Sequence, residues 1–239
     1  MREEPVFATL DASIERRGLR DRVYDRVLEL LLSGEVEPGA RLSIETIARQ
    51  LSVSPTPVRE AMVQLERTGL VNREALKGYR VAPPLTEAQL NELTEARVML
   101  ESTAARLATP AEDSLLRELD TALDAHRKAG EHLLKATADG SSDLSDTTDY
   151  FARDVDFHRI IFRHCGNRYL HDMSETLGGQ LHRMRQSALY GAIDVTEALS
   201  EHEAILVAFQ SSDPEAPARA MKHHIEQVGL RSLETQRRA

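Results

Sequence analysis

The sequence is poor in cysteine and in aromatic residues, and it contains no tryptophan. Its 239 residues include a single cysteine, Cys165, and aromatic side chains make up 4% of the chain. One thiol excludes an internal disulfide and a zinc site built from several cysteines, and it is typical of proteins in a reducing compartment. Apolar residues still account for 41% of the chain, which is enough for a substantial core.

Long hydrophobic runs are also missing. The N-terminal stretch MREEPVFATLDASIERRGLRD contains no apolar segment of signal-peptide length. No other segment approaches the roughly 20 apolar residues that a membrane-spanning helix needs. We therefore expect a cytoplasmic protein without a membrane partner.

Acidic and basic residues are unevenly divided along the chain, whose formal net charge is −9. Residues 1–82 contain 13 Lys and Arg against 13 Asp and Glu, whereas residues 83–239 contain 17 against 26. The acidic excess lies entirely in the second part. The first part is neutral overall and can still present a basic face to a nucleic acid.

The stretch SVSPTPVREAMVQLERTGLV, residues 52–71, predicts a short helix with a fixed start. A residue before proline is driven out of the helical region, so we expect Ser54 and Thr56 to be extended, with Thr56 capping a helix that begins at Pro57. Helical spacing predicts one buried apolar face and one basic or amide-bearing face. These faces consist of Val58, Ala61, Met62 and Leu65, and of Arg59, Gln64 and Arg67. The pattern suits a helix in a DNA major groove, although many surface helices share it.

The neighbouring segments strengthen the interpretation of residues 52–71 as part of a DNA-binding domain. Periodic apolar residues predict helices at 21–33 and 44–51, the second capped by Ser43, and LVNRE, LKG and YRVAP predict a hairpin with Gly78 at its tip. Three helices followed by a small β-hairpin make a winged helix-turn-helix. We expect a mobile arm at residues 1–18 and this DNA-binding domain at residues 19–82.

The remainder, residues 83–239, is predicted to be an all-helical domain that begins at the pair Pro83–Pro84. No segment in it alternates with a period of two, and an antiparallel helical bundle is the natural packing. The expected fold is therefore mostly α. Helices are predicted at about 86–108, 112–138, 145–164, 168–188, 194–210 and 214–236.

Polar residues interrupt the apolar stripes of this second domain. Asp154 and His158, four residues apart, share a helix face with apolar neighbours, and His202 and His224 do the same on two later helices. Three imidazoles and one carboxylate suit a divalent transition metal such as Zn²⁺, Ni²⁺ or Mn²⁺. The alternative is four unrelated core residues with local hydrogen bonds. The other histidines, His126, His132, His164, His171, His182 and His223, are interpreted as structural or surface residues.

Arg97 lies on the apolar face of the first helix of this domain. Its planar guanidinium suits a carboxylate, so it is a candidate contact for a small effector molecule. An ion pair with a buried Glu or Asp of the bundle is the alternative.

Two sets of motifs carry a family resemblance. The stretch GEVEPGARLSIETIARQLSVSPTPVREAMVQLERTGLVNREALKGYRV resembles the winged helix of the GntR family of bacterial transcription regulators. The motifs LTEARVMLESTAARLA, DVDFHRIIFRHCGNRYL, SEHEAIL and SSDPEAPARAMKHHI resemble the FCD effector domain of its FadR-like branch. The resemblance covers nearly the whole chain after about residue 19.

The resemblance implies a homodimer that binds a pseudo-palindromic DNA operator and responds to a small carboxylate. It places metal ligands at Asp154, His158, His202 and His224, in agreement with the stripes. It places DNA contacts at Ser54, Thr56, Arg59 and Gly78, with Lys77 beside the wing. Pro55 stands where the family usually has an operator-contacting arginine, so the operator sequence is expected to differ, or Arg49 compensates.

We therefore predict a transcription regulator, more often a repressor in this family, rather than an enzyme. Its operator binding would be modulated by a carboxylate metabolite at the metal site. The alternatives are a regulator that responds to the metal itself or holds a purely structural metal and, more remotely, a metal-dependent enzyme. Against an enzyme, no free base or nucleophile stands at a recognisable spacing beside the ligands.

Overall fold

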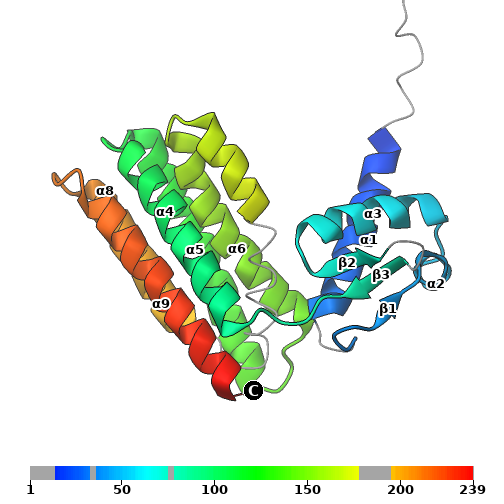
Figure 1. Cartoon of the computed structure of the whole chain (residues 1–239). Coiled ribbons are helices and arrows are strands. Elements are labelled where there is room, and N and C mark those ends of the chain that lie inside the picture. The colour runs from blue at the N-terminus through cyan, green and yellow to red at the C-terminus, as the bar shows by residue number, and fades with distance from the viewer. Residues whose placement is uncertain (1–13, 33–35, 75–77, 178–194, 239) are drawn as a thin grey trace, which may run out of the picture. The chain divides into compact units, whose positions relative to one another are not determined.

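The computed structural model describes residues 14–32, 36–74, 78–177 and 195–238. The chain divides into two compact units, Met1–Pro83 and Pro84–Ala239. Figure 1 shows both, the first coloured blue to cyan and the second green to red. Each unit is described by itself.

The first unit combines helices with a small sheet. Helix α1 begins within the stretch predicted as an arm, so residues 14–18 are helical rather than part of a mobile arm. The elements are α1 Ile14–Leu32, β1 Arg41–Leu42, α2 Ile44–Gln50, α3 Pro55–Arg67, β2 Val71–Glu74 and β3 Gly78–Val81. Helices α1 and α2 both pack against α3 (Figure 1).

The sheet has three strands in the order β1-β3-β2, one more than the predicted hairpin. Strand β1 pairs antiparallel with β3 through Arg41 and Leu42, and it was missed because two residues show no periodicity. Gly78 is the first residue of β3, opposite Glu74, rather than the tip of the turn. Its φ of +89° is one that L side chains rarely adopt. The tip, residues 75–77, lies outside the described part of the chain.

Helix α3 starts two residues earlier than predicted. Ser54 is extended with ψ of 159° and occupies the N-cap position, whereas Thr56 lies inside the first turn between Pro55 and Pro57. The prediction of an extended, capping Thr56 is therefore wrong. Both prolines fit the first turn, because the first N–H groups of a helix have no partner within it.

The predicted apolar face of α3 forms the centre of the first unit. Val58, Ala61, Met62 and Leu65 are all 0% exposed. Val23, Val27 and Leu31 of α1 are buried as well. Full burial of each large apolar side chain contributes roughly 1.5–3 kcal/mol, so this face fixes α3 and leaves its opposite face free.

The second unit is helical throughout its described residues. Its long helices are α4 Glu87–Leu107, α5 Asp113–Ala138, α6 Leu144–His164, α8 Val195–Gln210 and α9 Ala216–Arg238. Their bounds agree with the predicted ones within two residues. Residues 168–177 are also helical, and the rest of the helix predicted at 168–188 lies outside the described residues.

These five helices form a closed ring. Helix α4 packs against α6 and α9, α5 packs against α6 and α8, and α8 packs against α9. The apolar core lies inside the ring and receives side chains from all five helices, including Ala104, Leu119, Phe157, Ile205 and Ile225. A polar side chain on an inward face is therefore brought close to the inward faces of the other helices.

Candidate metal centre and DNA-reading helix

The four residues predicted as metal ligands meet inside the ring. Asp154 and His158 lie one turn apart on α6, His202 lies on α8, and His224 lies on α9. One ligand atom from each lies within 4.8 Å of those from the others. The three histidines are at most 8% exposed. Three separate helices thus supply one compact group of donors.

The distances within this group fit a single metal ion. The three Nε2 atoms form a nearly equilateral triangle: His202 is 3.2 Å from both His158 and His224, and these two are 3.3 Å apart. A tetrahedral site with metal–nitrogen bonds of about 2.0–2.1 Å places neighbouring nitrogens roughly 3.3 Å apart. Oδ1 of Asp154 lies 3.6 Å from Nε2 of His202 and 3.8 Å from Nε2 of His158.

The outer nitrogen of each histidine has a partner of its own. Nδ1 of His158 lies 2.6 Å from Glu101 of α4, and Nδ1 of His224 lies 2.7 Å from Glu201 of α8. Nδ1 of His202 lies 3.1 Å from Nδ1 of His126 on α5. A neutral imidazole that donates its Nδ1–H has an unshared electron pair on Nε2, the atom that could bind a metal ion in the inner triangle.

Arginines pair with the two glutamates. Nε of Arg97 lies 2.7 Å from Glu101, and the guanidinium of Arg231 contacts both carboxylate oxygens of Glu201 at 2.7 and 2.9 Å. Burial by itself raises the pKa of Glu101, but Arg97 and His158 outweigh it and lower the pKa to about 2. Burial likewise opposes ionisation of Glu201, and Arg231 and His224 lower its pKa to about 2. Both glutamates are therefore charged acceptors at neutral pH.

His202 and His224 are held in their neutral form. Burial lowers the pKa of His202 well below its usual value, and the adjacent His224 and His158 lower it further. Burial also lowers the pKa of His224, although its hydrogen bond to Glu201 opposes this shift. Neutral imidazoles bind metal ions and imidazolium groups do not.

Arg97 is 4% exposed and its observed ion pair is with Glu101 of the same helix. An ion pair with a buried acidic residue of the bundle is the alternative that the sequence suggested for Arg97. A contact between Arg97 and an effector stays a prediction.

Sequence reasoning missed the outer partners of the histidines. His126 was interpreted as a structural or surface residue. Its exposure of 0% agrees with a structural role, and its contact with His202 was not foreseen. Glu101 lies four residues after Arg97, a spacing that predicts an ion pair on one helix face. Glu201 gives no such signal, because a glutamate that precedes a histidine on a helix is commonly a surface residue.

The residues predicted to contact DNA lie at the start of α3 and near it. Thr56 and Arg59 are exposed, with Arg59 3.9 Å from Glu45 of α2. Ser54 is exposed and makes no side-chain capping bond, and Arg49 is exposed in the last turn of α2. Gly78 lies at the start of β3, and Lys77 falls outside the described residues. These contacts with DNA stay predictions.

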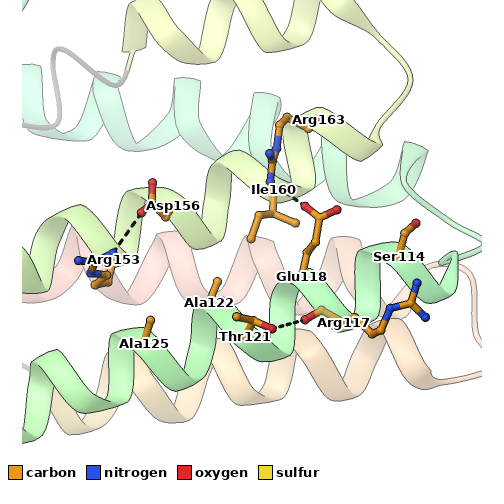
Figure 2. A pocket seen from close by; sticks show the side chains of 10 residues that line it. All are labelled: Ser114, Arg117, Glu118, Thr121, Ala122, Ala125, Arg153, Asp156, Ile160 and Arg163. Carbon is orange, nitrogen blue, oxygen red and sulfur yellow. Dashed lines mark hydrogen bonds and ion pairs between the residues drawn. The ribbon is translucent and has the colours of Figure 1, made fainter.

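A separate groove of about 450 Å³ lies between α5 and α6 (Figure 2). It contains none of the four clustered residues. Of its three arginines, Arg153 lies close to Asp156 and Arg163 to Glu118. These ion pairs compensate the positive charge of two of the three arginines. The groove is therefore a weaker candidate for a ligand-binding site than the cluster inside the ring.

Comparison with known families gives two matches that together cover most of the chain. Residues 19–81 match the family described as bacterial regulatory proteins, gntR family, and residues 92–227 match the FCD domain. The second match alone spans more than half of the chain. Among the described residues, no helix is long and apolar enough to cross a membrane.

Two relatives that align over most of this chain are named as transcriptional repressors. A protein of Paenarthrobacter nicotinovorans, named as the probable transcriptional repressor of a D-xylose utilization operon, is 29% identical over 89% of this chain and 88% of its own. The transcriptional repressor RspR of Escherichia coli K12 is 26% identical over 81% and 79%. The solved structure of E. coli McbR/YncC covers 90% of this chain and 97% of its own, with 24% identity and a TM-score of 0.69, which shows the shared fold.

Proposed function

Because the chain belongs to the GntR family of bacterial regulatory proteins and carries an FCD domain, and is therefore a DNA-binding transcription regulator, we propose that it is a metal-dependent, carboxylate-responsive repressor. The observation that supports this most strongly is the convergence of Asp154, His158, His202 and His224 within 4.8 Å in the FCD unit. The same chain bears a winged helix-turn-helix with an exposed face on α3.

The proposed DNA contacts come from the first turns of α3 and from the wing. Ser54, Thr56 and Arg59 would face the operator, with Lys77 and Gly78 at the wing and Arg49 as a further cation. Since Pro55 offers neither charge nor N–H, the contact made by an arginine in other members would be absent. We propose a homodimer on a pseudo-palindromic operator, because two recognition helices require two half-sites.

The FCD unit would sense the effector through the cluster. When bound, a Zn²⁺, Ni²⁺ or Mn²⁺ ion supplies a positive centre that attracts an effector carboxylate. Asp154 is the only charged residue of the four described ligands, so the occupied site would keep an excess of positive charge. The ligands join α6, α8 and α9, and a change at the site would therefore bear on three helices of the ring.

The first experiment measures operator binding by fluorescence anisotropy with purified, metal-loaded protein. Carboxylic acids are first screened by thermal shift, and each acid that stabilises the protein is then added to the operator complex. The proposal expects at least one acid to change operator affinity, and expects a chelator to abolish that change. Unchanged operator affinity with every stabilising acid would contradict carboxylate sensing.

Arg97 is the proposed second contact for the effector. Because it pairs with Glu101, it would have to exchange this carboxylate for that of the effector. The variant Arg97→Lys keeps the charge but loses the planar fork, so it is expected to weaken effector binding. Equal effector affinity of the variant and the wild type would exclude this contact.

The burial of the cluster favours one alternative, in which the ion itself is the signal or only stabilises the ring. His202 is 0% and His224 1% exposed, as is common for structural metal sites closed to ligands. Operator titrations with and without metal, in the absence of any acid, separate the cases. A metal signal changes operator affinity by itself, whereas a structural metal changes only the melting temperature.

A further inference from the structure

Two relays of the same composition approach the cluster of Asp154, His158, His202 and His224 from two different pairs of helices. In one, Arg97 and Glu101 of α4 reach His158 of α6. In the other, Arg231 of α9 and Glu201 of α8 reach His224 of α9. Each relay runs from guanidinium to carboxylate to the outer nitrogen of an imidazole whose inner nitrogen faces the cluster.

We infer that Glu101 and Glu201 are positioning residues of the metal centre, each held in place by its arginine. This inference rests on the proposed function, because it assigns roles toward the metal that the cluster would bind. Neither glutamate belongs to the four predicted ligands. Each would act through a histidine, by fixing which nitrogen carries the proton and where the ring points.

The first step of the argument concerns the proton. Nδ1 of His224 donates a hydrogen bond to the Glu201 carboxylate at 2.7 Å, and the Glu101 carboxylate lies 2.6 Å from Nδ1 of His158. A negative oxygen beside Nδ1 places the proton of a neutral imidazole on that nitrogen. The unshared pair is consequently on Nε2, the atom that lies in the triangle. A carboxylate partner also makes the ring a stronger electron donor toward a metal ion.

The second step concerns the arginines. A carboxylate as buried as Glu101, at 6% exposure, would be strongly destabilised without a cation. Arg97 supplies that cation within the same helix, and Arg231 binds both oxygens of Glu201, a geometry that fixes the plane of the carboxylate. The arginines therefore hold both acceptors charged and oriented before a metal ion arrives.

The third histidine provides an internal contrast. The outer nitrogen of His202 contacts another imidazole, that of His126, instead of a carboxylate, and its ring stacks on Phe157 with 4.3 Å between centroids. Packing rather than charge orients this ring. The relays are thus a feature of His158 and His224 and not a general property of the cluster.

Helix α4 contributes none of the four ligands, and among the described residues it reaches the cluster through Glu101. The same helix begins at Glu87, three residues after Pro84 in the segment that leads from the DNA-binding unit. At its N-terminal end, Glu87 forms an ion pair with Arg237 of α9 at 2.9 Å. The Glu101 relay therefore gives the metal centre a contact with the helix that continues from the DNA-binding unit.

The test measures Zn²⁺ affinity of the full-length protein by competition with a chromogenic chelator. The variant Glu201→Gln keeps the size of the side chain but removes the charge that His224 and Arg231 share. We expect it to bind Zn²⁺ about 10–100-fold more weakly than the wild type. Glu203→Gln is the matched control, because Glu203 is an exposed residue of the same helix, and its Zn²⁺ affinity should equal that of the wild type.

Glu101→Gln by itself leaves Arg97 buried without its carboxylate and is at risk of unfolding. The double variant Arg97→Met with Glu101→Gln removes both charges and keeps similar volumes. It is expected to fold, to melt cooperatively, and to bind Zn²⁺ about 10–100-fold more weakly. A helical content equal to that of the wild type, measured by circular dichroism, serves as the check that the variant is folded.

A purely structural role for the glutamates is distinguished by spectroscopy. With Co²⁺ in place of Zn²⁺, loss of a relay should change the visible absorption spectrum, because ligand orientation and basicity change, whereas lower stability alone would leave the spectrum of the folded protein unaltered. If the wild type binds metal, and both variants bind it with the affinity and the Co²⁺ spectrum of the wild type, the inference is overturned and the proposed metal centre survives. If the wild type binds no metal, the proposed function fails with it.

Discussion

The two units treat polar side chains in opposite ways. In the first unit, the candidate functional residues Thr56, Arg59 and Arg49 are exposed, and Thr68 is the single buried polar residue among those described. The second unit buries eight polar or charged side chains among its described residues: Arg97, Glu101, His126, Thr147, His158, His202, His224 and Ser232. A DNA reader uses an outer face, whereas a sensor of small ions and molecules uses an interior from which water is excluded. The proposed function is thus separable from stability in the first unit and bound to it in the second.

The sharpest way to break this comparison is to remove a ligand from the interior. His202→Ala deletes the donor that lies within 3.2 Å of both other imidazole nitrogens. It should weaken Zn²⁺ binding by more than the roughly 100-fold upper range for an outer partner. Competition with a chelator measures this loss. His223→Ala, an exposed neighbour of His224, is the control and should bind Zn²⁺ as the wild type does.

A core substitution in the first unit tests whether its interior serves only stability. Met62→Ala removes a side chain that is 0% exposed and should lower the free energy of unfolding by about 2–5 kcal/mol. Urea denaturation followed by circular dichroism measures the change. Val63→Ala, at a position 43% exposed, should have a much smaller effect, and equal losses for the two variants would contradict the assigned α3 packing.

A surface substitution in the same unit should do the reverse. Arg59→Ala removes an exposed cation from α3 and should weaken operator binding by about 1–3 kcal/mol while the melting temperature stays unchanged. Fluorescence anisotropy at fixed salt measures the affinity. Arg26→Ala is the matched control, because it removes the same charge from an exposed position on α1. Unchanged affinity of the Arg59 variant would count against α3 as the reading helix.

Acid should affect the second unit before the first. His202 and His224 have pKa values lowered from 6.5 in the folded, metal-free protein, so the unfolded chain binds more protons below about pH 6.5 and stability falls as the pH drops. Glu101 and Glu201 have pKa values lowered from 4.5 to about 2, so their contribution is lost as the pH falls from 4.5 toward 2. Thermal melts between pH 7.5 and 5 measure the first change, and His202→Ala should reduce it.

Much of the fold follows from periodicity in the sequence. The apolar spacing of Val58, Ala61, Met62 and Leu65 gave the buried face of α3, and the long helices of the second unit were placed within two residues. Two local features escaped. Strand β1 is too short to show a pattern. The start of α3 was misplaced because only Pro57 was expected in its first turn, whereas the first turn contains both Pro55 and Pro57.

The candidate metal centre was only half visible in the sequence. Asp154, His158, His202 and His224 stand out because they interrupt apolar stripes, and a buried polar group needs a partner. Their outer partners do not stand out in the same way. Glu101, Glu201 and His126 lie on helices that carry many polar residues. The neighbouring sequence does not indicate which of these polar side chains faces the interior.

The sequence by itself determined the helices, the division between a helix-turn-helix head and a helical ring, and the four polar residues that face inward. Helical periodicity depends only on local spacing, so it can be read along one chain. Only the tertiary structure decided that Glu101 reaches His158, that Glu201 joins Arg231 to His224, and that His126 meets His202. All of these contacts join different helices, and their distances are set by how the ring closes.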